Sequence, residues 1–273
     1  FIRDTTDRNR TSPFAFTGNK FEFRMLGSSN SIACANIMLN TAVAESLKLY
    51  ADELEKAEDF DTALHELIKN TIKAHKRIIF NGNGYDDVWI REATEERGLL
   101  NLRTTPDAIS MLIQKDNMEM LIAHKVYTES EIRSRYEILL ENYCKVVRIE
   151  ALTMVDMAKK EILPAVEAYV SSLVSVASAK RSLDADIPSS YEQKLIKRLA
   201  TLVDTIDCRT ASLESEMVKL DTMGDFTEEA AFIRDKVIPQ MSELRVVVDE
   251  AETMTAENYW PFPTYGDLLF GVK

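Results

Sequence analysis

Residues that break helices are scarce in this sequence. Its 273 residues include only 8 glycines and 7 prolines, about half of the share found in an average protein. Because tight turns need these two residues, their scarcity disfavours a β-sandwich and any other loop-rich fold. It favours long helices instead.

Cysteine is also rare, which excludes a disulfide framework. Cys34, Cys144 and Cys208 are odd in number and far apart, unlike the even sets that form such frameworks. Each lies among apolar residues of helical pattern, so the sequence predicts a buried free thiol at each position. Free thiols fit a reducing compartment, and we expect the cytoplasm.

Basic residues are outnumbered, with 33 Lys and Arg against 45 Asp and Glu and a net charge of −12. Nucleic acids and anionic membranes repel a chain this acidic, so we expect neither as a partner. The longest uncharged run, residues 25–44, is too polar to span a bilayer. The first residues also lack the basic start and apolar stretch of a signal peptide.

Apolar residues recur at spacings of three and four over most of the chain. Within residues 126–256 this pattern predicts three long helices, of which the first would be a rod of roughly 80 Å. We expect Pro164 to kink that rod and Pro239 to bend the last helix. Such helices bury their apolar stripes only against one another or a partner, so the fold class is mainly α, with an antiparallel bundle or hairpin.

Cap residues mark where helices begin. Thr128 with Glu131 and Ser189 with Glu192 have the spacing of capping boxes, and residues 225–228 repeat that signal. Thr105, before a proline, predicts the cap of a shorter helix. Outside the bundle, the pattern predicts helices over 31–58 and 62–80, short helices over 85–125, and an irregular aromatic tail over 259–265 that packs into a groove of this chain or a neighbour.

The three histidines, His65, His75 and His124, are isolated on helical segments and predict no shared metal site. The N-terminal segment carries more chemistry. A polar loop rich in cations precedes the stretch 20–24, whose period of two places two phenylalanines on one face and Lys20, Glu22 and Arg24 on the other. A carboxylate between cations suits a metal and phosphate site. Spacing alone also fits an exposed strand with paired charges.

Two stretches resemble the type III glutamine synthetases. Residues 8–24, RNRTSPFAFTGNKFEFR, are similar to the Asn-Arg-Ser loop and charged strand of the last catalytic motifs, and residues 134–143, SRYEILLENY, are similar to a later stretch. The likeness covers essentially the whole chain. It is specific over residues 7–36 and diffuse beyond about residue 150.

This resemblance implies roles for four residues. Glu22 matches the strand carboxylate that holds an active-site Mg²⁺ or Mn²⁺, and Arg24 matches the arginine at the bound glutamate. Arg10 matches the loop arginine that meets the phosphates and the substrate, and Lys20 lies where a nucleotide-side cation is usual. More familiar types carry a second loop arginine, which is Ala15 here.

The implied reaction is the ATP-dependent joining of ammonia to glutamate, in which the side-chain carboxylate of glutamate takes the γ-phosphoryl group and ammonia displaces phosphate. By the same resemblance, residues 1–60 end an α+β catalytic domain, 61–125 form a helical linker region, 126–256 form a long-helix domain and 257–273 form the aromatic tail. The chain would be a C-terminal portion that is inactive alone. A hypothesis of another class is a helical module for oligomerisation, since the family assembles as stacked rings.

Overall fold

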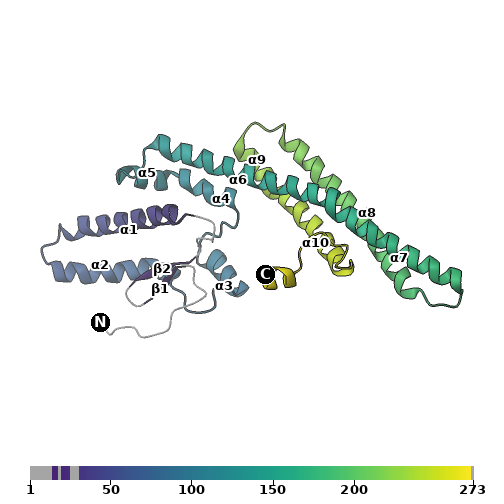
Figure 1. The fold of residues 1–273 in the computed structure, drawn as a ribbon. Helices are drawn as coiled ribbons and strands as arrows, with labels where there is room; N and C mark the ends of the chain where they lie inside the picture. The colour runs from purple at the N-terminus through teal and green to yellow at the C-terminus, as the bar shows by residue number, and fades with distance from the viewer. Residues whose placement is uncertain (1–13, 18–19, 25–30, 272–273) are drawn as a thin grey trace. The chain divides into compact units, whose positions relative to one another are not determined.

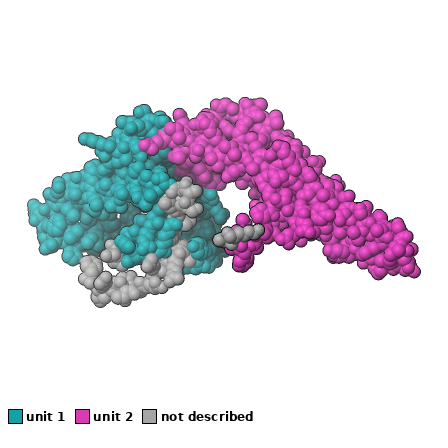
Figure 2. All heavy atoms as spheres, viewed as in Figure 1, with its two compact units in different colours: residues 1–103, 110–134 teal, residues 104–109, 135–273 magenta. Residues whose placement is uncertain are grey.

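The computed structural model describes residues 14–17, 20–24 and 31–271 and is mainly helical (Figure 1). A two-stranded antiparallel sheet precedes the helices, so the predicted fold class is confirmed. The chain divides into two compact units (Figure 2). Unit 1 comprises residues 1–103 and 110–134, and unit 2 comprises 104–109 and 135–273. The segment 104–109 thus belongs to unit 2, although both of its sequence neighbours belong to unit 1.

Unit 1 combines the sheet with short and medium helices. Strand β1 (Phe14–Phe16) pairs with β2 (Phe21–Phe23). The helices are α1 (Ile32–Leu54), α2 (Phe60–His75), the 3₁₀ turn η1 (Lys76–Ile78), α3 (Asp87–Arg91), the π-turn η2 (Glu92–Glu96), the 3₁₀ turn η3 (Ser110–Ile113) and α5 (Lys115–Ala123). The Oγ of Ser31 caps α1, and a carboxylate oxygen of Asp59 caps α2.

A small core and one polar contact hold α5 to α1. Met118, Leu121 and Ile132 are buried together. The Nε2 atom of His124 lies 2.6 Å from a carboxylate oxygen of Glu45 on α1. His124 therefore has a structural partner on α1.

An aromatic stack closes the turn-rich region after α2. The rings of Phe80 and Trp89 are stacked with centroids 3.7 Å apart, and the guanidinium carbon of Arg97 lies 4.8 Å from the Trp89 centroid. Arg97 also donates hydrogen bonds to the carbonyl oxygens of Arg77 and Ile79, at 3.0 and 2.9 Å. The chain then turns at Gly98, whose φ of +63° favours glycine.

Unit 2 is the predicted bundle, preceded by the short helix α4 (Thr105–Ile109). The helix α6 (Glu129–Met157) begins in unit 1 and continues without a break through η4 (Ala158–Ile162) and α7 (Leu163–Leu183). The other bundle helices are α8 (Ser190–Leu220), α9 (Phe226–Phe232), η5 (Ile233–Val237) and α10 (Ile238–Met254). One continuous buried cluster joins them, and its fully buried members include Leu140, Val166, Leu199, Leu213, Ile233 and Leu244.

Ion pairs fix the antiparallel register of the bundle. Along α8, the partners of Asp221, Glu214 and Glu192 are in turn Arg148, Lys159 and Lys180. Residue numbers fall on one helix as they rise on the other, as an antiparallel pair requires. On the other side of α8, Arg198 and Arg209 pair with Glu250 and Glu243 of α10.

Both prolines that we expect to bend helices follow a π-turn. In η4 the N–H of Leu163 donates to the carbonyl of Ala158, five residues back, and in η5 Ile238 donates to Ile233 in the same way. A proline in an ordinary helix lacks one donor and clashes with the carbonyl four residues earlier. The wider turn before Pro164 and Pro239 relieves that clash within a continuous helix.

Several local predictions need correction. Thr128 and Glu131 form the expected capping box, but Ser189 makes no capping bond and Glu192 pairs with Lys180 instead. The cap of α4 is Thr104 rather than Thr105, because the Thr104 Oγ1 accepts from the N–H of Asp107. Cys144 is buried as predicted, whereas the prediction is wrong for Cys34 and Cys208, which are exposed.

The aromatic tail packs within unit 2. Trp260 and Phe262 lie against the bundle core, and the Tyr259 ring lies 5.2 Å from that of Tyr169 on α7. The prediction that the tail fills a groove is confirmed for these residues. A short helix, α11 (Tyr265–Phe270), follows it and has no counterpart in the sequence prediction.

One helix in the described chain, Glu129–Leu183, is long and apolar enough to cross a membrane by length and composition alone. A search for uncharged runs misses it, because isolated charged residues interrupt its apolar stretch. Its C-terminal part packs along α8 with Val166, Val170 and Leu173 in the bundle core, an arrangement typical of a bundle helix.

Candidate functional site

The two short strands separate aromatic from polar side chains. Antiparallel pairing places Phe14 opposite Phe23, Ala15 opposite Glu22 and Phe16 opposite Phe21. Since neighbouring residues of a strand point to opposite faces, the four phenylalanines share one face and Ala15 shares the other with Glu22. The rings of Phe14 and Phe21 are stacked at 5.0 Å. The predicted alternation along the second strand is therefore confirmed.

The charged face brings three of the four predicted site residues together. The carboxylate of Glu22 lies 3.1 Å from the guanidinium of Arg24 and 4.0 Å from the ammonium of Lys20. The side chains of Glu22 and Arg24 are about three-quarters buried, at 27% and 24% exposed, whereas Lys20 is 68% exposed. The fourth residue, Arg10, lies outside the described residues.

The small side chain of Ala15 leaves space for the carboxylate of Glu22 on this face of the sheet. Ala15 is 3% exposed, and it is the strand partner of Glu22. A small side chain there leaves room beside the carboxylate, whereas a longer one would compete for the same space. The sequence showed an alanine at this position, but its register opposite Glu22 depends on the β1–β2 pairing.

Glu22 is the only acidic residue on this face among the strand residues that the structure describes. Among the described residues, no group of three or more His, Cys, Asp or Glu side chains gathers to hold a metal ion. The carboxylate of Glu22 is a suitable oxygen donor for a hard cation such as Mg²⁺. Alone it is one oxygen-donor residue, fewer than a metal ion of this kind needs.

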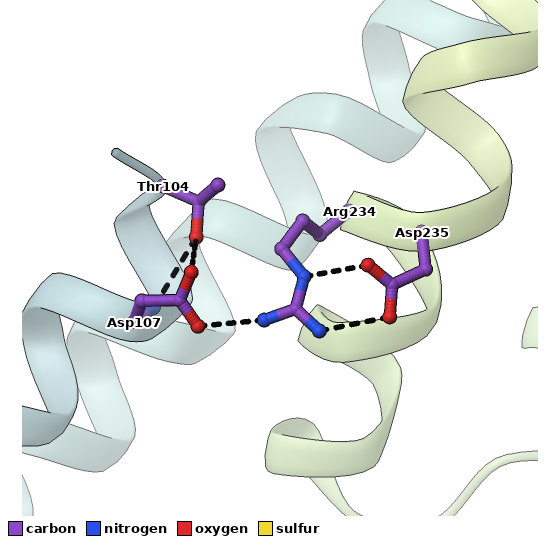
Figure 3. Close-up of polar contacts among 4 residues, drawn as sticks. All are labelled: Thr104, Asp107, Arg234 and Asp235. Atoms are coloured by element: carbon purple, nitrogen blue, oxygen red, sulfur yellow. Dashed lines mark hydrogen bonds and ion pairs between the residues drawn. The ribbon is translucent and has the colours of Figure 1, made fainter. Parts of the chain in front are cut away.

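A second polar cluster, in unit 2, was missed by sequence reasoning (Figure 3). The guanidinium of Arg234 forms two parallel hydrogen bonds to Asp235, at 2.7 and 2.8 Å, and a third to Asp107, at 2.6 Å. Asp107 in turn accepts from the hydroxyl of Thr104. The bonds to Asp235 raise the pKa of Arg234, and that guanidinium lowers the pKa of the Asp235 carboxyl.

The Arg234 cluster attaches α4 to the bundle. Thr104 and Asp107 lie on the segment 104–109, and Arg234 lies at the start of the π-turn η5. All five guanidinium donors suit carboxylates, and Arg234 uses three of its nitrogens here. No local pattern predicts this contact, because Asp107 and Arg234 are 127 positions apart.

A family model and three proteins of known family match the chain. A family model described as the glutamine synthetase C-terminal domain matches residues 63–181. A glutamine synthetase from Butyrivibrio fibrisolvens is 39% identical over 283 residues, which cover 100% of this chain and 39% of that protein. A type-3 glutamine synthetase from Dictyostelium discoideum is 36% identical over 98% of this chain and 37% of its own length.

A glutamine synthetase from Bacteroides fragilis (strain YCH46) is 32% identical over 98% of this chain and 38% of its own length. The chain thus spans less than two-fifths of the length of each of these relatives. The likeness inferred from residues 8–24 and 134–143 agrees with these matches, one of which is named as type 3. The chain therefore belongs to the glutamine synthetase family and is a C-terminal portion of a type III member.

Proposed function

We propose that this chain supplies part of the active site of an ATP-dependent ligase that joins ammonia to glutamate in the cytoplasm. The observation that carries the proposal is the contact of Glu22 with Arg24 and Lys20 on one strand face, at positions that match the family motif. In the proposed reaction, ATP phosphorylates the side-chain carboxylate of glutamate and ammonia then displaces phosphate. Positioning and charge stabilisation are what such a transfer needs from a protein.

Each residue of this face would hold one reactant group. Glu22 would provide a carboxylate ligand for Mg²⁺ or Mn²⁺, which when bound offsets the negative charge of the transferring phosphoryl group. Arg24, held in place by Glu22, would bind the carboxylate of glutamate. Lys20 is exposed enough to reach an anionic nucleotide, and Arg10 would contact the phosphates. The chain has no second arginine at Ala15, so it would make fewer nucleotide contacts from this loop.

The proposal is tested in a chimaera in which this chain replaces the matching portion of the Butyrivibrio fibrisolvens enzyme. Glutamine formation is measured as Mg²⁺ is varied. We expect Glu22→Gln to reduce kcat by about 10- to 100-fold and to shift the Mg²⁺ dependence to higher concentration, because loss of a metal ligand weakens metal binding. The chain alone should form no glutamine.

The matched control is Glu137→Gln, which removes one carboxylate from an exposed position on α6. It should leave both kcat and the Mg²⁺ dependence unchanged. The same activity for the Glu22 variant and the parent chimaera, at all Mg²⁺ concentrations, would exclude the proposed role of this strand. Turnover by the chain alone would contradict the expectation that it is incomplete.

A second function, subunit assembly, is favoured by a separate observation. On α6 the buried stripe that includes Leu140, Val147 and Ala151 faces the bundle, and apolar side chains also lie on the opposite side. Ile138, Val146, Ile149 and Leu152 are between 45% and 64% exposed. An exposed apolar stripe on a long helix is typical of a surface that binds another protein. These four residues form the α6 stripe. We propose that the chain forms homo-oligomers through the α6 stripe.

A further inference from the structure

Unit 2 contains a cavity of about 310 Å³ that the proposed function does not use. Residues of α6, η4 and α10 line it, and the tail adds Trp260 and Phe262 to its lining. Its volume lies at the lower end of the range for small-molecule sites. Trp260 and Phe262 come from outside the helices, so the tail forms part of the cavity wall.

The lining of this tail cavity suits a polarisable apolar group. Met154 and Met157 contribute flexible thioether side chains, which adapt to irregular ligands. The rings of Trp260 and Phe262 meet edge to face, with centroids 6.0 Å apart and an angle of 74°. Two rings in this arrangement present one ring face and one ring edge, and a ring face attracts cations.

The charges beside the cavity favour a cation as well. Arg245, Asp249 and Glu252 line it from successive turns of α10. Arg245 is paired with Asp249, with 2.5 Å between donor and acceptor, and the three charged side chains together carry a net charge of −1. Among the described residues, Glu252 has no ion-pair partner. One excess negative charge therefore lies beside an apolar, aromatic interior.

We propose that the tail cavity binds small organic ammonium ions that carry an apolar body. The body fills the space between Met154, Met157 and the tail rings, and the ammonium group lies between Trp260 and the carboxylate of Glu252. Neutral molecules of the same shape gain only the apolar contacts, and anions are repelled by Glu252. The site is independent of the strand face, so its test does not depend on ligase activity.

Trp260 provides a reporter for this binding. The chain has 2 tryptophans, and the other, Trp89, belongs to the stack in unit 1. In the full chain with Trp89→Phe, fluorescence therefore reports on Trp260 alone. Titrations use 2-phenylethylammonium, 2-phenylethanol and phenylacetate, which share a phenyl ring and differ in the charge of the end group.

We expect a saturable change in emission with the ammonium ion, which binds roughly three- to tenfold more tightly than the alcohol. Phenylacetate should bind least. Glu252→Gln should remove the preference for the ammonium ion over the alcohol, and Glu150→Gln, an exposed carboxylate elsewhere on α6, should leave it unchanged. Val248→Phe, which fills the cavity from α10, should abolish binding of both ligands.

Circular dichroism of each variant verifies that the bundle is folded, and Glu252→Gln changes only an exposed side chain. The proposal is overturned if the ammonium ion gives no saturable change. It is equally overturned if the alcohol binds as tightly as the ammonium ion, or if the preference persists in the Glu252 variant.

Discussion

The three thiols of this chain differ in their exposure to solvent. Cys144 is 1% exposed, and burial raises the pKa of its thiol to about 12. Its Sγ lies 3.8 Å from the carbonyl oxygen of Phe226. Cys34 and Cys208 are exposed. All three lie in similar apolar helical surroundings in the sequence, so only packing against neighbouring helices separates them.

This difference predicts selective alkylation. Because the thiolate is the reactive form, a thiol with a pKa near 12 is almost entirely protonated at pH 8, and Cys144 should remain unmodified by iodoacetamide. Cys34 and Cys208 should react under the same conditions. Peptide mass spectrometry gives the modified fraction at each site, and guanidinium should make Cys144 react as well. Equal modification of all three thiols in the folded chain would contradict its burial.

Among the helices, the π-turn η4 keeps one face of a long helix in the core. From Ala158 the next buried positions are Ile162, Val166 and Val170, three successive steps of four residues. Each such step in an α-helix rotates the side chain by about 40° away from its starting direction. The wider turn offsets part of that drift, so the residues on both sides of Pro164 face α8.

Removing one residue from η4 should therefore be tolerated. Deletion of Lys160, combined with Pro164→Ala, lets the π-turn become an ordinary α-helical turn. The buried residues before and after it then still point into the bundle core. Deletion of Lys145, an exposed lysine in the α-helical part, rotates one side of the helix by about 100°. Because buried apolar side chains stabilise by roughly 1.5–3 kcal/mol each, the Lys145 deletion should cost about 3 kcal/mol or more.

Denaturant unfolding followed by circular dichroism measures both deletions. The Lys160 deletion should change the free energy of unfolding by less than about 1 kcal/mol, within the range of a single backbone hydrogen bond. If both deletions cost the same, η4 does not act as a removable extra residue.

Sequence reasoning succeeds where a pattern is local and long. The long helix that begins at Glu129 has many repeats of one periodicity, and the alternation around Glu22 needs only neighbouring residues. It fails where the outcome depends on distant partners. Glu192 has the spacing of a capping box but pairs with Lys180, and Asp107 contacts Arg234 across the bundle.

Both π-turns share a sequence pattern, which can be recognised only after the structure has located the turns. Residues 158–164 read AKKEILP and residues 233–239 read IRDKVIP. Each has an apolar residue, three charged residues, two apolar residues and a proline. The buried first and fifth positions face the core in both turns. Without the structure, this pattern is indistinguishable from an ordinary amphipathic turn before a proline.

Across the whole chain, burial is unevenly distributed. Of the described residues, most of the fully buried apolar ones belong to the bundle cluster of unit 2, and a smaller cluster in unit 1 contains Met118, Leu121 and Ile132. Helix α1 in unit 1 exposes Ile32, Val43, Leu47 and Leu49. Apolar surface of this kind is typical of a chain that binds further protein. The α6 stripe has the same property on unit 2.

The proposed role of the α6 stripe in assembly predicts an effect on size. Ile149→Lys combined with Val146→Lys should lower the mass measured by light scattering, because lysine side chains resist burial at an interface. Val218→Lys provides the control, since Val218 on α8 is 65% exposed and Ile149 is 64% exposed. A mass that is the same for the double variant and the parent, or a monomeric parent, would contradict assembly through this stripe.

The placement of residues 104–109 in unit 2, between two stretches of unit 1, has a consequence for evolution. A single recombination crossover cannot exchange one unit between two homologous genes without leaving this short insert with its former host. Residues 104–109 and the bundle helices would then be encoded by different parent genes. Asp107 would face whichever residue the other gene encodes at the position of Arg234. Asp107 and Arg234 should therefore be inherited together. Recombination between such genes should favour breakpoints that do not separate the codons of these two residues.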